Sequence, residues 1–133
     1  MRKYYLFVIR KEVYEIYKHK PESLFRTLRN LYCLKPEDFE YGISLYHQLC
    51  EPFDVKRLED YMIEKYRLEK RGHIFIYENN YMMIKPARII IKTNVNMPNL
   101  FMDFKCYNRL IFVVDFDMLD YFFLCEDYNQ LKS

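Results

Sequence analysis

KYYLFVI, residues 3–9, is a nearly continuous apolar run of aromatic and branched side chains. Successive side chains of a β-strand point to opposite faces, so a run without alternating polar positions predicts a strand that is buried on both faces. We therefore expect residues 3–9 to form a core strand of a sheet.

Helical periodicity follows this strand. Helices are predicted over about residues 11–18, from Pro21, from Pro36, and from Asp54 as N-cap to about Arg67. Proline in the first turn and acidic residues beside it are typical of a helix N-terminus. The expected apolar faces of the last three helices are Leu24, Leu28, Leu31 and Tyr32; Phe39, Ile43, Tyr46 and Leu49 or Cys50; and Val55, Leu58, Met62 and Tyr66.

Beyond Gly72 the period becomes strand-like. Residues 72–77 and 81–85 predict a hairpin closed through Glu78-Asn79-Asn80, because paired asparagines tolerate the positive φ of such turns. Further elements are expected at 88–93 (strand), 99–107 (helix), and 109–116 and 121–125 (a hairpin through 117–120). The pattern predicts one α+β domain over residues 1–133, with helices in the N-terminal half packed on a mostly antiparallel sheet of the N-terminal strand and C-terminal hairpins.

The composition is that of a globular protein. In a chain of 133 residues, 51% hydrophobic content is enough for a sizeable core without a disulfide or metal. No apolar run approaches the roughly eighteen residues of a membrane span, and the start does not resemble a signal segment, so we expect a cytoplasmic protein with no membrane partner. The widely spaced cysteines are interpreted as buried thiols in a reducing compartment: Cys33, Cys50, Cys106 and Cys125.

The sequence lacks the usual catalytic patterns. Gly42 and Gly72 stand alone, which disfavours a phosphate-binding loop, and no serine lies in a nucleophile elbow. We therefore expect no enzyme activity, no catalytic residues, no metal and no cofactor.

Two constellations leave metal chemistry open as alternatives. His47 and Cys50 lie one helical turn apart, but a buried thiol beside a hydrogen-bonded histidine is favoured over zinc. Asp115 and Asp117 resemble the metal-binding pair of some transferases, but aspartates at a strand end more often cap the backbone amides of a turn.

The net charge of +2, from 21 basic and 19 acidic residues, gives little reason to expect direct nucleic-acid binding. The alternative is a small nucleic-acid-binding domain that stacks bases on strand aromatics and contacts phosphates through Lys3, Arg88 and Lys92. The basic stretch 65–71, interleaved with acids, is interpreted as a solvated helix end.

The first helix carries more apolar residues than one layer of core needs. Val13, Tyr14, Ile16 and Tyr17 spread over roughly 160° of its circumference, so part of this arc should face solvent. One interpretation places the tyrosine rings flat along the domain with their hydroxyls in water. The other makes Val13 and Tyr17 an anchor for a partner protein, with Tyr14 at the rim.

The chain resembles the SirA family, sporulation inhibitors of replication in spore-forming bacteria. The resemblance spans almost the whole chain in order and rests on these residues: Tyr4-Tyr5, Val8-Ile9, Glu12, Tyr17, Glu22-Ser23, Tyr46, Pro52, Gly72-His73, Val114-Asp115-Phe116, Tyr121 and Leu124.

The SirA resemblance implies a non-enzymatic inhibitor that binds the N-terminal domain of the replication initiator DnaA through a helical surface. In the family the first helix presents aromatics one turn apart, and the matching positions here are Val13 and Tyr17. Ile43 and Tyr46 match contacts from a nearby helix. Val13 departs from the pattern, because the family carries a larger aromatic ring there.

Overall fold

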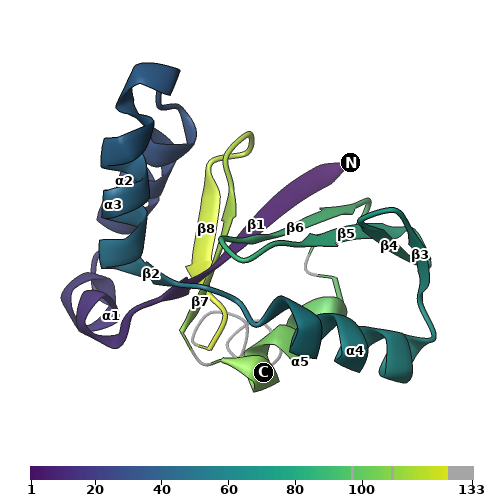
Figure 1. The fold of residues 1–133 in the computed structure, drawn as a ribbon. Coiled ribbons are helices and arrows are strands. Elements are labelled where there is room, and N and C mark those ends of the chain that lie inside the picture. Colours follow the sequence, from purple (N-terminus) through teal and green to yellow (C-terminus); the bar gives the residue numbers. More distant parts are fainter. Residues whose placement is uncertain (97, 109, 126–133) are drawn as a thin grey trace.

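Strand β1 (Arg2–Ile9) lies inside an antiparallel sheet in the computed structural model, which describes residues 1–96, 98–108 and 110–125 (Figure 1). The other strands are β2 (Cys50–Glu51), β3 (Glu69–Arg71), β4 (Ile74–Tyr77), β5 (Asn80–Ile84), β6 (Ile89–Thr93), β7 (Ile111–Asp115) and β8 (Asp120–Phe123). They follow the order β3-β4-β5-β6-β1-β7-β8, and the short β2 pairs with the end of β1. The helices are α1 (Lys11–Tyr17), α2 (Pro21–Tyr32), the 3₁₀ turn η1 (Pro36–Asp38), α3 (Phe39–Leu49), α4 (Val55–Tyr66) and α5 (Leu100–Tyr107).

Both faces of β1 are buried, as the apolar run predicted. Its even-numbered residues from Tyr4 to Val8 belong to one hydrophobic core, and its odd-numbered residues from Tyr5 to Ile9 belong to a second core across the sheet. Burying each side chain of this size contributes roughly 1.5–3 kcal/mol. Strand β1 is therefore the element that both cores share.

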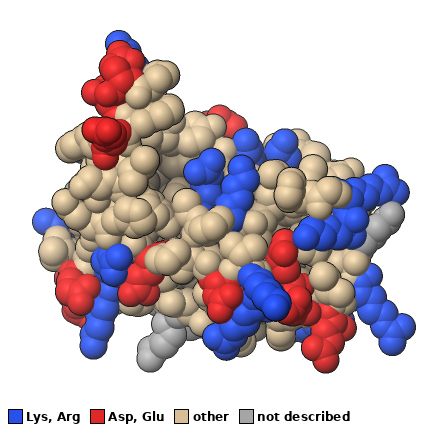
Figure 2. Space-filling model, viewed as in Figure 1, with Lys and Arg blue, Asp and Glu red and all other residues tan. Residues whose placement is uncertain are grey.

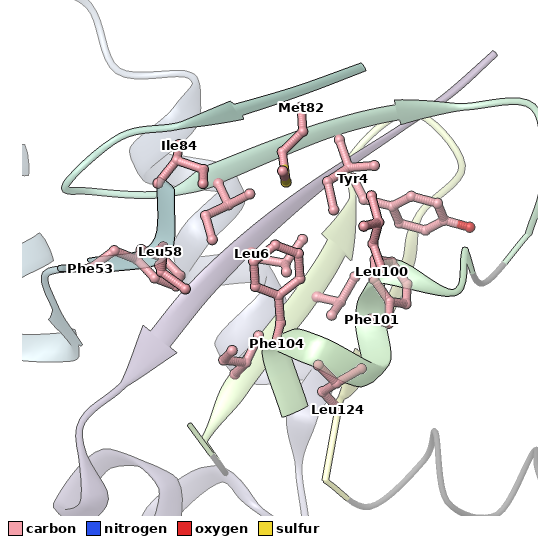
Figure 3. Packing of buried hydrophobic residues seen from close by; sticks show 14 of the residues in the cluster. Tyr4, Leu6, Phe53, Leu58, Met82, Ile84, Leu100, Phe101, Phe104 and Leu124 are labelled. Carbon is pink, nitrogen blue, oxygen red and sulfur yellow. The ribbon is translucent and has the colours of Figure 1, made fainter. Parts of the chain in front are cut away.

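Helices α4 and α5 cover the first core. Figure 3 shows Leu6 with Phe104, and Tyr4 near Phe101, between the sheet and α5. The Tyr4 and Phe101 rings meet edge to face with their centroids 5.2 Å apart. At the start of α4, the Asp54 side chain accepts a 3.2 Å hydrogen bond from the Arg57 backbone N–H, which confirms the predicted N-cap.

One buried carboxylate joins α4 to α5. Asp103 of α5 is 7% exposed and accepts a 3.1 Å hydrogen bond from the Tyr61 hydroxyl. Its carboxylate also accepts hydrogen bonds from the Lys65 ammonium and the Tyr66 hydroxyl, all three donors lying on α4. Burial, assisted by the bond to Asp103, raises the pKa of Tyr66 to about 12.

Helices α1, α2 and α3 lie at one end of the sheet and cover the second core there (Figure 1). Helix α2 supplies Leu24, Phe25 and Leu28, which are buried. The Phe25 ring stacks on Tyr121 of the β8 strand with centroids 4.9 Å apart. The predicted α+β class, with helices mostly in the N-terminal half and an antiparallel sheet, is confirmed.

Only the first part of residues 65–71 is the helix end that the charge pattern predicted. Arg67 adopts a left-handed backbone conformation, φ 50°, which terminates α4. The chain then turns, and Lys70 and Arg71 pair with β4 as part of β3. The prediction of a helix end is therefore correct for Lys65 and Arg67, which lie in the last turn and at the C-cap of α4, and wrong for Lys70 and Arg71, which belong to an edge strand.

The hairpin from β4 to β5 closes differently from the expected asparagine turn. Asn80 is part of β5 and pairs with Tyr77, and Glu78 adopts the positive φ of 52°. The hairpin itself is confirmed, whereas the assignment of positive φ to the asparagines is wrong. The expected first residue of the β7 strand, Arg109, lies outside the described residues.

The four cysteines have different environments. Cys50 is buried, and its burial raises the pKa of the thiol to about 12. Cys33 and Cys106 are exposed and Cys125 is partly exposed, so the prediction of four buried thiols is wrong except at Cys50. All four are free cysteines.

Within the described residues, no helix has the length and apolar character required to cross a bilayer.

Candidate docking site

A groove of about 440 Å³ lies between helices α2 and α3 and the loop that joins β5 to β6. Its walls include Leu31 and Tyr32 of α2, Ile43 and Tyr46 of α3, and residues 86–88 of the loop. This volume is within the range of small-molecule binding pockets, roughly 300–1,000 Å³. The groove is mostly apolar, because most of its lining side chains are aliphatic or aromatic.

Two contacts shape the groove. At Gly42 the α3 backbone packs so closely on the preceding loop that a Cβ atom would lie 2.4 Å from Cδ1 of Leu34. On the other side, the Tyr46 hydroxyl donates a 3.0 Å hydrogen bond to the carbonyl of Ala87, which connects α3 to the β5–β6 loop. Burial raises the pKa of Tyr46 to about 12, so the hydroxyl keeps its proton over the neutral range.

Three large apolar side chains at the groove are more than half exposed. Tyr32 and Phe39 are each 53% exposed, and Ile43 is 60% exposed. Phe39 and Ile43 lie on the apolar face predicted for α3, but the fold leaves both exposed, and of that face Leu49 and Cys50 are buried. Exposed apolar patches of this kind mark interaction surfaces.

Among the described residues, Arg88 is the only arginine or lysine in the groove lining, and none of the described lining residues is acidic. Its guanidinium carbon lies 5.9 Å from the centroid of the Tyr5 ring, and Lys3 Nζ lies 5.1 Å from the same centroid. The Tyr5 hydroxyl in turn donates a 3.2 Å hydrogen bond to the Tyr32 hydroxyl. Figure 2 shows mostly uncharged residues over α3 and the adjoining end of the sheet, with acidic side chains toward the outer end of the α2 and α3 helices and basic side chains over the sheet beside this surface.

Helix α1 presents a different face from the predicted one. Val13 is only 9% exposed and belongs to the second core, so the prediction of an uncovered anchor at Val13 is wrong. Tyr14 is partly buried, with its ring 4.9 Å from that of Phe123, and Tyr17 also packs partly against this core. The large apolar side chain that α1 leaves exposed is Ile16, at 59% exposure.

The predicted docking residues therefore fall into two sets. Val13, Tyr14 and Tyr17 pack against the second core and do not line the groove, whereas Ile43 and Tyr46 line the groove, and Tyr46 also packs against that core. Arg10, which precedes α1, connects α1 to α3. Its Nε donates a 2.7 Å hydrogen bond to the carbonyl of His47, and its backbone N–H donates a 2.9 Å hydrogen bond to the carbonyl of Leu49.

Sequence reasoning missed three groove residues. Helical spacing places Tyr32 and Phe39 on the apolar faces of their helices, and the sequence suggests Arg88 only as a phosphate contact. Helical spacing identifies the apolar side of a helix but not whether another element covers it. The proximity of Arg88 to Tyr5 arises from the pairing of β6 with β1, which is a long-range contact.

Asp115 has the turn-capping role that the sequence favoured. Its Oδ1 accepts hydrogen bonds of 3.1 Å from the backbone N–H groups of Asp117 and Met118. Its Oδ2 accepts a 3.0 Å hydrogen bond from Nε of Arg2, and the residue is 1% exposed. The carboxylate is therefore occupied by contacts within the fold.

The favoured interpretation of Cys50 as a buried thiol is also confirmed. In the described parts of the chain, no three His, Cys, Asp or Glu residues come together as potential metal ligands.

The basic residues of the nucleic-acid alternative lie near one another. Lys3 and Lys92 are directly opposite in the β1–β6 register, and Tyr81 pairs with Lys92 from β5. The Tyr81 side chain is 43% exposed, whereas the nearby Tyr5 is buried at 4%. A stacking surface uses several accessible rings. The geometry here therefore favours this alternative less than it favours docking at the apolar groove.

A scan of protein-family models gives no match to this chain, and a search of curated proteins finds no similar sequence. The SirA resemblance is therefore the basis of a proposal about function rather than an identification.

Proposed function

We propose that this protein is a non-enzymatic regulator that acts in the cytoplasm by binding another protein. The proposed partner is the N-terminal domain of DnaA, by resemblance to the SirA family. The observation that carries the proposal is the 60% exposure of Ile43 at the edge of an apolar groove. Ile43 and its groove neighbour Tyr46 are positions that match the partner-binding helix of that family.

Docking at this surface would bury side chains that the fold leaves in water. Transfer of an exposed Ile or Phe side chain into an apolar interface contributes roughly 1.5–3 kcal/mol when burial is complete. A micromolar complex requires about 8 kcal/mol of binding free energy after the costs of association. Ile43, Phe39 and Tyr32 would thus be the central contacts, and Ile16 and Tyr17 of α1 would extend the interface.

The proposed mechanism is occupation of the partner's surface. The protein would cover part of the DnaA N-terminal domain and so keep DnaA from supporting new rounds of initiation as the cell commits to sporulate. This mechanism requires an interface and no chemical step.

Calorimetry with the purified DnaA N-terminal domain tests the proposal. We expect a one-to-one complex that Ile43→Ala or Tyr17→Ala weakens on the order of tenfold or more, because Ile43→Ala removes a central apolar contact and Tyr17→Ala removes the ring with which α1 extends the interface. Ile63→Ala is the matched control: Ile63 is 42% exposed on α4, away from the groove. The proposal is wrong if no complex forms, or if both interface variants bind as tightly as the parent protein.

A further inference from the structure

Arg88 indicates which kind of partner segment the groove accepts. Arg88 lines the groove, and its Nε is buried without a hydrogen-bond partner within the described residues. A buried N–H donor that stays unpaired costs roughly 1–3 kcal/mol. The fold therefore leaves this partly buried guanidinium group incompletely paired beside an apolar surface.

The surroundings of Arg88 supply no counter-charge. Among residues 1–96, 98–108 and 110–125, no carboxylate lies within ion-pair distance of its guanidinium group. The Tyr5 ring, 5.9 Å from the guanidinium carbon, orients the side chain but accepts no strong hydrogen bond. Arginine binds carboxylates through parallel N–H···O bonds, so this site is complementary to a carboxylate.

The shape of the site indicates a protein segment rather than a small molecule or nucleic acid. Tyr32, Phe39 and Ile43 lie at the groove and are each more than half exposed, so an occupant must be long enough to cover them as well as the hollow. Nucleic acid would require a series of cations along the groove, whereas Arg88 is the single Arg or Lys among the described residues of its lining.

We propose that the groove binds an amphipathic segment of a partner protein whose apolar side chains contact Ile43 and Tyr32 and whose acidic side chain pairs with Arg88. This inference rests on the proposed function only in requiring a protein partner; it does not depend on that partner being DnaA.

Selection from a library of short random peptides displayed on phage, with the full-length protein as bait, tests the inference directly. We expect the selected peptides to combine aromatic or aliphatic residues with at least one Asp or Glu. A selected peptide should lose on the order of tenfold or more in affinity when its acidic residue is changed to Gln or Asn, since a charge-assisted hydrogen bond is lost.

Arg88→Met shows whether Arg88 is the group that recognises the acid, because it keeps an unbranched apolar stem and removes the charge. The acidic peptide should bind this variant on the order of tenfold more weakly, and the Gln or Asn peptide should bind it about as well as it binds the parent. Lys92→Met is the matched control, because Lys92 is exposed on the same β6 segment but does not line the groove. Arg88→Lys, which retains the charge, should preserve part of the preference for the acidic peptide. Unchanged binding of the Gln or Asn peptide by Arg88→Met shows that this variant is not misfolded.

The inference is overturned if selection yields no binding peptide, if the selected peptides lack acidic residues, or if Arg88→Met and Lys92→Met affect their affinities equally. Failure of the DnaA complex with successful selection of acidic peptides would overturn the proposed partner and leave this inference standing. If Ile43→Ala weakens the DnaA complex and Arg88→Met does not, the proposed partner stands and the inference about Arg88 is overturned.

Discussion

Arg2 and Asp115 are 113 positions apart in the chain, yet Nε of Arg2 donates a 3.0 Å hydrogen bond to Oδ2 of Asp115. This contact ties the start of β1 to the end of β7, where the other oxygen of Asp115 caps the turn into β8. A second nitrogen of Arg2 contacts Asp120 at 3.0 Å across the same turn. Arg2 therefore links the start of β1 to both strands that flank the β7–β8 turn.

Asp115→Asn should destabilise the fold. The amide retains an oxygen for the two turn N–H groups but presents no charge to Arg2, and hydrogen bonds to charged groups contribute about 1.5–3 kcal/mol. We expect the free energy of unfolding, measured in urea, to fall by about 1–3 kcal/mol. Asp117→Asn at the exposed neighbour should change it by less than about 0.5 kcal/mol. Equal effects of the two variants would contradict a stabilising role for the charged contact between Asp115 and Arg2.

The Tyr66–Asp103 contact predicts a loss of stability at alkaline pH. The pKa of Tyr66 is raised to about 12 in the folded protein, mainly by burial, against an ordinary value of 10.0. Because the folded pKa is the higher one, its contribution to stability is fully present below pH 10 and declines as the pH rises toward 12. Urea unfolding across this range should show a smaller decline for Tyr66→Phe than for the parent; identical declines would show that Tyr66 is not a source of the effect.

Substitution of Val13 should lower stability much more than substitution of Ile16. Val13 is 9% exposed and packs in the second core, whereas Ile16 is 59% exposed on the same helix. Val13→Ala should lower the free energy of unfolding by about 1–3 kcal/mol, because it leaves a cavity. Ile16→Ala should change stability by less than about 0.5 kcal/mol. A stable Val13→Ala protein would show that this side chain is not part of the core.

Thiol labelling should distinguish the cysteines. Cys33 and Cys106 are exposed, whereas Cys50 is buried with its thiol pKa raised to about 12, so its thiolate is scarce at neutral pH. Mass spectrometry after brief alkylation of the native protein should therefore find Cys33 and Cys106 modified and Cys50 intact. In denaturant, all four should react. Modification of Cys50 at the rate of Cys33 under native conditions would contradict its burial.

Local features made most of the fold predictable. Some signals depend only on residues close to one another in the chain: the apolar run of β1, the proline that begins α2 and the Asp54 cap of α4. Each of these predicted elements is present. The short strands β2 and β3 were not predicted. A strand of two or three residues has too few positions to show a period, and it forms because a neighbouring strand is available to pair with it.

The candidate site was only partly predictable. Ile43 and Tyr46 do line a surface groove, but Val13 is a core residue and Arg88 belongs to the groove. By itself the sequence determined which residues are apolar and where the helices begin, because periodicity and caps are local properties of the chain. Only the tertiary structure decided that Val13 is covered and Ile43 is not, and that Arg88 lies beside the apolar groove without a counter-charge. Burial and charge pairing depend on which distant segments pack together, and no local pattern in the chain specifies that.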